Sequence, residues 1–158
     1  MQSKNNYIKS LSLIIFILIV AISCGNNPTD YGKFHKNHNL LLGTWTSTYN
    51  ETFIYDGLTF TSAYSGSTTY KMEAEKIIWS SDYSGIIYGR YTKNTYSPEV
   101  VGLYYAVSFK DLSRNKVSIS GASKGDGKKG GGTLEEAISE FTIENGYFGI
   151  YSVCEKSE

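Results

Sequence analysis

The sequence predicts a mainly β protein: an antiparallel barrel of eight or nine short strands, or alternatively a β-sandwich, with one short helix in the C-terminal region. Three observations lead to this class. Tyr, Thr and Ile are frequent, with 14 Tyr in 158 residues, and these residue types favour strands. The 16 Gly residues, together with Ser, break the chain at short intervals. Most segments between the breaks alternate apolar and polar residues.

The predicted strands begin at residue 43. Alternation and turn signals place them at 43–49, 52–55, 58–64, 69–79, 86–93, 100–110, 116–120 and 147–153. The pair Asp56-Gly57 is a strong hairpin signal between the second and third strands. In the fourth strand the alternation changes phase near Ile77-Ile78, which predicts a β-bulge. The sixth strand alternates most clearly, with Tyr105 and Phe109 on one face.

A Gly- and Lys-rich stretch, "GASKGDGKKGGG" at 121–132, predicts a mobile surface loop. It is not a phosphate-binding loop of the Walker type, because no hydroxyl residue directly follows a Gly-Lys pair. Thr133-Leu134-Glu135-Glu136 then forms a capping box, in which the Thr133 hydroxyl accepts from the amide of Glu136. This predicts the helix, running to Phe141.

The N-terminus has the three zones of a secretory signal peptide. Lys4 and Lys9 make the start positive, the run 11–22 is apolar apart from Ser12, and the small residues Ser23-Cys24-Gly25 follow. A membrane-spanning helix needs about 20 apolar residues, so this run is too short to span. We therefore expect residues 1–23 to be removed.

The residues Ala21-Ile22-Ser23-Cys24 resemble the lipobox of bacterial lipoproteins. The resemblance implies cleavage before Cys24 and acylation of its thiol and new amino group. The chain would then be held at the bacterial cell envelope, in the outer membrane or at the cell surface, by acyl chains that anchor it stably. Ala21 and Ile22 depart from the preferred Leu and small residue. Ordinary cleavage that leaves Cys24 free is the alternative.

Removal of 23 residues leaves 135, the size of one domain. We divide them into a flexible tether, 24–39, and a β-domain, 40–158. The leader contains two of the 15 Lys and Arg residues, so 13 basic side chains remain against 15 acidic ones. With no strongly basic patch, a nucleic-acid partner is not expected. Cys154 is the one further cysteine, and we expect it to be a small buried residue.

The stretch "LLGTW" (Leu41–Trp45) opens the first strand, and its Gly-x-Trp resembles the lipocalins and the wider calycin group. The resemblance implies an eight-stranded barrel with a ligand pocket. It also implies that Trp45 closes one end under a basic side chain, for which Arg114 and Lys116 are the candidates. The alternative is a generic β-domain in which Trp45 is simply a core aromatic. The segments 102–112 and 133–142 are similar to small treponemal-type lipoproteins of unassigned function.

Two functions are consistent with these features. In the first, the barrel encloses a small apolar or amphipathic ligand. The candidate ligand-binding residues are Trp45, Phe60, Met72, Tyr88, Tyr105 and Phe109. In the second, bulky side chains fill the barrel, and the protein is a surface interaction protein, an adhesin or a binder of an envelope partner, acting through exposed Tyr and the Gly-rich loop.

Enzymatic chemistry and a cofactor are not expected. His35 and His38 are the only histidines and lie in the predicted tether, away from other metal ligands, so neither a metal site nor a catalytic triad is predicted. Glu73 and Glu75 alternate with apolar residues, which is typical of the solvated face of a strand. We name no catalytic residue.

Overall fold

The structure, a computed structural model, describes residues 35–157. Its strands are β1 (Gly43–Ser47), β2 (Glu51–Tyr55), β3 (Thr59–Tyr64), β4 (Ser67–Ser81), β5 (Ser84–Asn94), β6 (Tyr104–Lys110), β7 (Lys116–Gly121) and β8 (Ser152–Lys156). Its helices are α2 (His38–Leu41), the 3-10 helix η1 (Pro98–Val100) and α3 (Leu134–Glu140).

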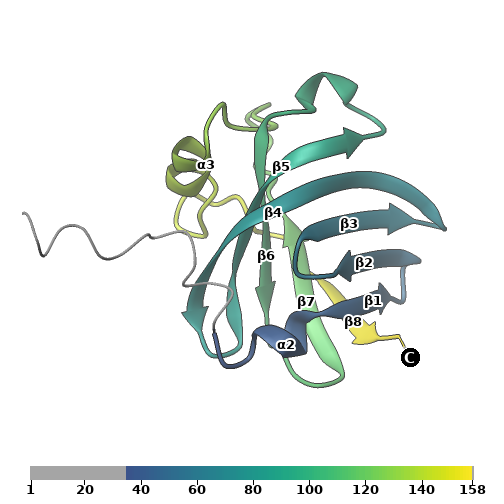
Figure 1. The fold of residues 1–158 in the computed structure, drawn as a ribbon. Coiled ribbons are helices and arrows are strands. Elements are labelled where there is room, and N and C mark those ends of the chain that lie inside the picture. The colour runs from purple at the N-terminus through teal and green to yellow at the C-terminus, as the bar shows by residue number, and fades with distance from the viewer. Residues whose placement is uncertain (1–34, 158) are drawn as a thin grey trace, which may run out of the picture.

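The eight strands form a closed antiparallel barrel (Figure 1). Each strand pairs with its neighbours in the sequence, and β8 closes the cylinder by pairing with β1. This confirms the predicted barrel with a short C-terminal-region helix and excludes the sandwich alternative. No helix among residues 35–157 is long and apolar enough to span a bilayer.

The barrel has two ends, which the up-and-down order of the strands defines. The end that carries α2, called the α2 end below, also holds the β2–β3, β4–β5 and β6–β7 turns. The opposite end, called the η1 end, holds the β1–β2 and β3–β4 turns and the connection from β5 through η1 to β6. In Figure 1 the α2 end lies at the bottom of the view.

The long strand β4 curves around the barrel (Figure 1). Its pairing with β5 shifts register at three places, one of them between Ala74 and Lys76, close to the bulge predicted near Ile77-Ile78. Gly89 of β5 faces β4 next to this shift, where a Cβ atom would clash with the carbonyl of Glu73. A residue without a side chain is therefore needed where the strand bends.

The C-terminal third differs from the expectation. Helix α3 forms as predicted, with the Thr133 hydroxyl accepting from the amide of Glu136 at 3.2 Å. The strand predicted at 147–153 is wrong in its first half, because β8 begins only at Ser152. Tyr147 is buried outside the strands, with its ring 4.9 Å from that of Phe141. This contact holds the chain against α3 before it returns to the barrel.

The start of the described chain packs on the barrel. His35 stacks on Trp79 with ring centroids 4.0 Å apart, and the Lys36 ammonium lies 2.6 Å from the Asp82 carboxylate. Residues 35–39, which we assigned to the tether, therefore belong to the folded domain. The predicted signal peptide, Cys24 and the rest of the predicted tether lie outside the described residues.

Candidate functional site: the barrel interior and its two ends

The half of the barrel interior nearest α2 is packed with large side chains. Strand register places Tyr55, Phe60 and Met72 side by side in one row across β2, β3 and β4. Four of the predicted ligand-binding residues are almost fully buried: Trp45 1 %, Phe60 2 %, Met72 0 % and Phe109 1 % exposed. A void of water size beside them would leave some of their surface accessible, so protein atoms fill this half.

The other half of the interior contains a cluster of three tyrosines. The rings of Tyr91 and Tyr105 stack at 4.7 Å, and the ring of Tyr70 meets both edge-on, at 5.7 and 5.5 Å. The Tyr105 hydroxyl donates to the carbonyl of Ala122 at 2.9 Å. Burial raises the pKa of Tyr105 to about 12, and burial also raises the pKa of Tyr70. These phenols therefore remain protonated and act as donors at neutral pH.

Polar side chains accompany the tyrosines toward the η1 end. The Ser47 hydroxyl donates to the Glu51 carboxylate at 2.9 Å, and the Thr69 hydroxyl lies 2.9 Å from that of Ser62. Glu51 and Tyr70 are only partly buried, in contrast to the apolar side chains that fill the half of the interior nearest α2. The interior thus changes from apolar and filled to polar and partly accessible along the barrel axis.

Tyr88 does not belong to the interior. It lies between the inward residues Ile87 and Gly89 and therefore points outward. Its hydroxyl donates to the carbonyl of Phe141 at 3.0 Å, just after α3, which lies outside the barrel next to β5 (Figure 1). The structure brings Trp45, Phe60, Met72, Tyr105 and Phe109 together inside the barrel and places Tyr88 under α3.

The α2 end is closed by Trp45. Its indole N–H donates to the carbonyl of Leu41 at 2.9 Å. Over the ring lies the ammonium of Lys156, 4.9 Å from the centroid and 3.3 Å from the carbonyl of Leu40. The basic partner is therefore Lys156 of β8, and the expectation of Arg114 or Lys116 is wrong. Both expected residues lie at the start of β7 or before it, whereas β8 is the strand that pairs with β1.

The η1 end displays three exposed tyrosines on neighbouring turns. Tyr49 is 74 %, Tyr64 53 % and Tyr96 77 % exposed. The β1–β2 and β3–β4 turns are joined by a hydrogen bond from the amide of Ser65 to the carbonyl of Asn50, at 2.9 Å. In the same way, the amide of Thr95, next to Tyr96, donates to the carbonyl of Thr69 near the start of β4. Sequence reasoning did not select these three, because exposed and buried Tyr look alike in a strand-rich pattern.

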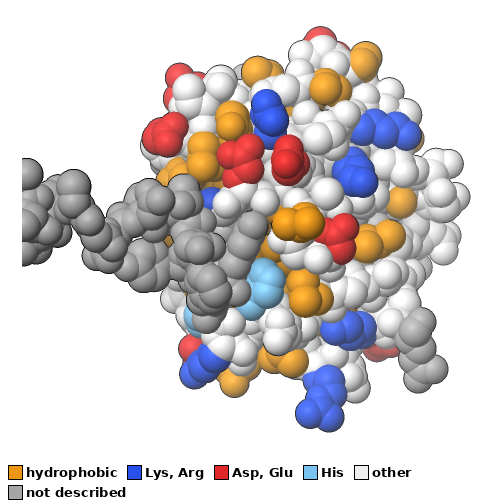
Figure 2. Space-filling model, viewed as in Figure 1, with side chains coloured by type: hydrophobic (Ala, Val, Ile, Leu, Met, Phe, Trp, Pro, Cys, Tyr) orange, Lys and Arg blue, Asp and Glu red, His pale blue; other side chains and the backbone are white. Residues whose placement is uncertain are grey.

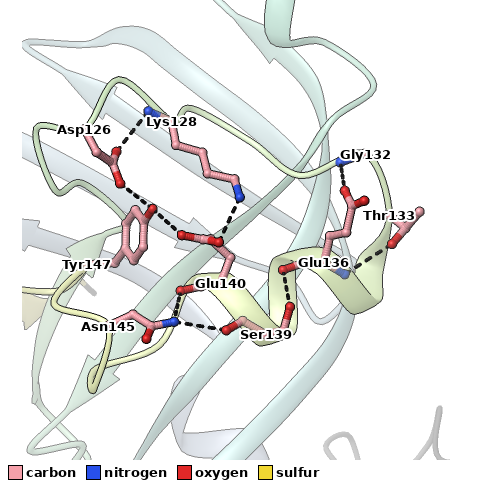
Figure 3. A network of polar contacts seen from close by, with 9 residues as sticks. All are labelled: Asp126, Lys128, Gly132, Thr133, Glu136, Ser139, Glu140, Asn145 and Tyr147. Atoms are coloured by element: carbon pink, nitrogen blue, oxygen red, sulfur yellow. Dashed lines mark hydrogen bonds and ion pairs between the residues drawn. The ribbon is translucent and has the colours of Figure 1, made fainter.

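The Gly-rich loop, predicted to be mobile, is tied to α3 by several contacts (Figure 3). The Lys128 ammonium lies 2.8 Å from the Glu140 carboxylate. The Tyr147 hydroxyl lies 2.6 Å from carboxylate oxygens of both Asp126 and Glu140. The Glu136 carboxylate accepts from the amide of Gly132 at 2.7 Å.

These contacts shift the acidity of the groups involved. The hydrogen bond from Tyr147 lowers the pKa of Asp126, while Lys128 first and Tyr147 second lower that of Glu140. The same two carboxylates raise the pKa of Tyr147 well above its ordinary value. We call this arrangement the loop clasp.

Within residues 35–157 no three His, Cys, Asp or Glu side chains are grouped to hold a metal ion. Cys154 is fully buried, as expected, and burial raises the pKa of its thiol to about 12. Glu73 lies outside the barrel, 3.6 Å from Arg90. Figure 2 shows acidic, basic and hydrophobic side chains interspersed on the face it views.

An open groove lies at the α2 end, between the β4–β5 hairpin and the β6–β7 turn. Its volume is about 700 Å³, and its walls include Leu40, Tyr83, Lys110, Leu112 and Arg114. The amide of Leu112 donates to the carbonyl of Tyr83 at 3.0 Å, which joins the two turns. This α2-end groove combines apolar walls with two cationic side chains.

Comparisons with known proteins give one structural similarity. No protein-family model matches the chain, and no curated protein sequence matches it either. Among solved structures, the crystal structure of pallilysin from Treponema pallidum is similar with a TM-score of 0.49 and 10 % sequence identity. The match covers 76 % of this chain and 82 % of pallilysin. A similarity at this level carries no information on activity or binding.

Proposed function

We propose that this chain is a lipid-anchored, non-enzymatic protein of the bacterial cell envelope that binds a protein partner through the η1 end of its barrel. Acyl chains on Cys24 hold it at the membrane. The barrel is a rigid scaffold that presents the tyrosine-bearing turns.

The filled interior is the observation that carries this proposal. A ligand enclosed in the half of the barrel nearest α2 would have to contact Trp45, Phe60, Met72 and Phe109. These side chains are packed against other side chains instead. A barrel filled in this way gains stability from its interior and leaves its outer surface for recognition.

The η1 end has the composition of a recognition surface. Tyr49, Tyr64 and Tyr96 expose large rings with a polar tip, a residue type that is enriched at the energetic centres of protein interfaces. Hydrogen bonds between the turns fix their relative positions, so less conformational entropy is lost when a partner binds.

Partner binding is tested by site-specific cross-linking on intact cells. A photoreactive phenylalanine analogue placed at Tyr64 or Tyr96 should give one discrete cross-linked product. The same analogue at Ile54, an exposed position on the barrel wall toward the α2 end of β2, is the matched control and should give none. Equal products at all three positions, or none at the tyrosines, would contradict the proposal.

The anchor is tested separately. Wild-type protein should partition into detergent, and intact-mass analysis should find acyl chains on a product that begins at Cys24. The variant Cys24→Ser should remain in the aqueous phase. A bare thiol in the mature wild-type protein would refute anchoring without affecting the cross-linking result.

A second candidate function is binding of a small amphipathic ligand at the η1 half of the interior. It is favoured by Tyr70 and Glu51, which are only partly buried, in contrast to the fully buried side chains of the other half. Native mass spectrometry of protein purified from its own cells separates the two functions. A co-purified small molecule that is lost in Tyr70→Ala would support this candidate, and a bare protein would support the scaffold.

A further inference from the structure

The α2-end groove has the chemistry of a site for an anionic amphiphile. Leu40 and the buried Leu112 supply apolar walls beside the ring of Tyr83. Lys110 and Arg114 add two positive charges. A volume of about 700 Å³ is that of a site for a lipid headgroup and part of its chains.

The cations of the groove are available to an anion. Among residues 35–157, neither Lys110 nor Arg114 belongs to an ion pair. The Lys110 ammonium lies over the ring of Tyr151, 4.1 Å from its centroid. Asp111, the one carboxylate of the groove, accepts a hydrogen bond from the Ser118 hydroxyl at 3.1 Å.

The groove also lies where the chain enters the domain. Lys36 pairs with Asp82 in the β4–β5 turn, next to Tyr83 of the groove. Ten residues separate Cys24 from His35. Even a fully extended chain of this length spans no more than about 40 Å. An acylated Cys24 would therefore keep the α2 end close to the bilayer surface.

Exposed apolar side chains mark the same end. Leu58 in the β2–β3 turn is 66 % exposed, and Tyr83 in the β4–β5 turn is 52 % exposed. Tyr is favoured at the boundary between lipid and water because its ring is apolar and its hydroxyl polar. The end that the chain length places near the membrane thus carries residue types that interact with it.

We propose that the α2-end groove binds the headgroup of an anionic phospholipid of the bilayer that holds the anchor. The inference rests on the anchoring part of the proposed function. Lys110 and Arg114 bind the phosphate, and Tyr83 and Leu40 contact the glycerol and the first part of the acyl chains. The barrel is thereby held upright, with the η1 end directed away from the membrane.

The test uses the mature chain carrying Cys24→Ser, so that no acyl chain contributes to binding. Co-sedimentation is measured with phosphatidylcholine vesicles that contain or lack phosphatidylglycerol. We expect binding only when phosphatidylglycerol is present. Arg114→Gln should weaken it about fivefold, since one cation near an anionic surface is worth about that factor. Lys93→Gln, an exposed cation at the far end of β5, is the matched control and should bind like the parent.

Each outcome decides the proposal. Binding that requires phosphatidylglycerol and is weakened by Arg114→Gln alone supports the groove. Equal weakening by Lys93→Gln indicates general charge attraction and overturns it, as does the absence of phosphatidylglycerol-dependent binding. Soluble glycerol 3-phosphate that binds the protein when the vesicles do not would show a free phosphate site and also overturn it. Because the tested chain is unacylated, these results do not depend on whether Cys24 is modified in cells.

Discussion

The Lys156 ammonium lies over the indole ring of Trp45, 4.9 Å from its centroid, and bonds the carbonyl of Leu40 at 3.3 Å. One side chain thus joins the last strand, the first strand and α2. Lys156→Ala should lower the free energy of unfolding by about 1–2 kcal/mol, measured by urea denaturation. Arg114→Ala and Lys116→Ala are the controls and should each cost less than about 0.5 kcal/mol. An equal loss in either control would show that Lys156 has no special role.

Gly43 precedes this contact in the Gly-x-Trp motif and should not tolerate a side chain. Its φ is +127°, and a Cβ atom would lie 2.8 Å from Cε of Lys156. Gly43→Ala should therefore cost at least about 2 kcal/mol. Gly66→Ala is the comparison without a steric clash, because Gly66 also has a positive φ, +79°, but open space around its Cα, and it should cost about 1 kcal/mol. Similar losses for both variants would refute the steric part of the argument.

Met72 tests whether the barrel is filled. Met72→Ala should leave a cavity and lower the free energy of unfolding by about 2–5 kcal/mol. Ile54→Ala on the outer face, where the side chain is 40 % exposed, should cost less than about 1 kcal/mol. A hollow barrel would instead give a small loss at Met72, since few contacts would be removed there.

The loop clasp should depend on pH. The pKa values of Asp126 and Glu140 lie below their ordinary 3.8 and 4.5 in the folded protein, so their contribution to stability is present above those values and lost as the pH falls through the folded-state values. Tyr147→Phe should lower the urea midpoint at neutral pH, and the difference should shrink below about pH 4. Tyr96→Phe, at an exposed position, should show no such dependence. A difference for Tyr147→Phe that stays constant with pH would contradict the argument.

Cys154 should be inert in the folded protein. Its pKa of about 12, three units above the ordinary 9.0, leaves about a thousandth of the usual thiolate at mildly alkaline pH. In the Cys24→Ser chain, where Cys154 is the remaining thiol, a disulfide reagent should react at least about a hundredfold more slowly before unfolding in urea than after it. Rapid modification of the native protein would show that the barrel opens at β8.

Local patterns predicted most of the fold because each of its features depends on neighbouring residues. Strand alternation, the Asp56-Gly57 turn and the capping box at Thr133 all act within a few positions of the chain. Sequence reasoning failed where a distant contact decides. The segment from Tyr147 has the composition of a strand, but its ring packs against Phe141 and its hydroxyl meets Asp126. No signal in the neighbouring residues shows that these contacts compete with strand formation.

The candidate site could be predicted only in part, because it also depends on contacts between residues that are distant in the chain. Alternation placed Phe60, Met72, Tyr105 and Phe109 on inward faces, but composition cannot show whether inward side chains meet or leave a space. Tyr88 was misplaced because both faces of β5 are apolar near α3, so its alternation is ambiguous. The groove at the α2 end escaped notice because it joins two turns that are far apart in the chain.

The seam between β1 and β8 consists of three residue pairs, whereas every other pairing joins strands that are consecutive in the chain. During synthesis, the meander can assemble progressively from its N-terminal side. Until residues 152–156 are in place, it is a curved open sheet. The backbone N–H and C=O groups of its two edge strands are unpaired and can pair with other chains. Closure of the barrel, and with it the loss of both exposed strand edges, thus depends on β8. A chain that ends before residue 152 would be expected to aggregate rather than to function at reduced efficiency.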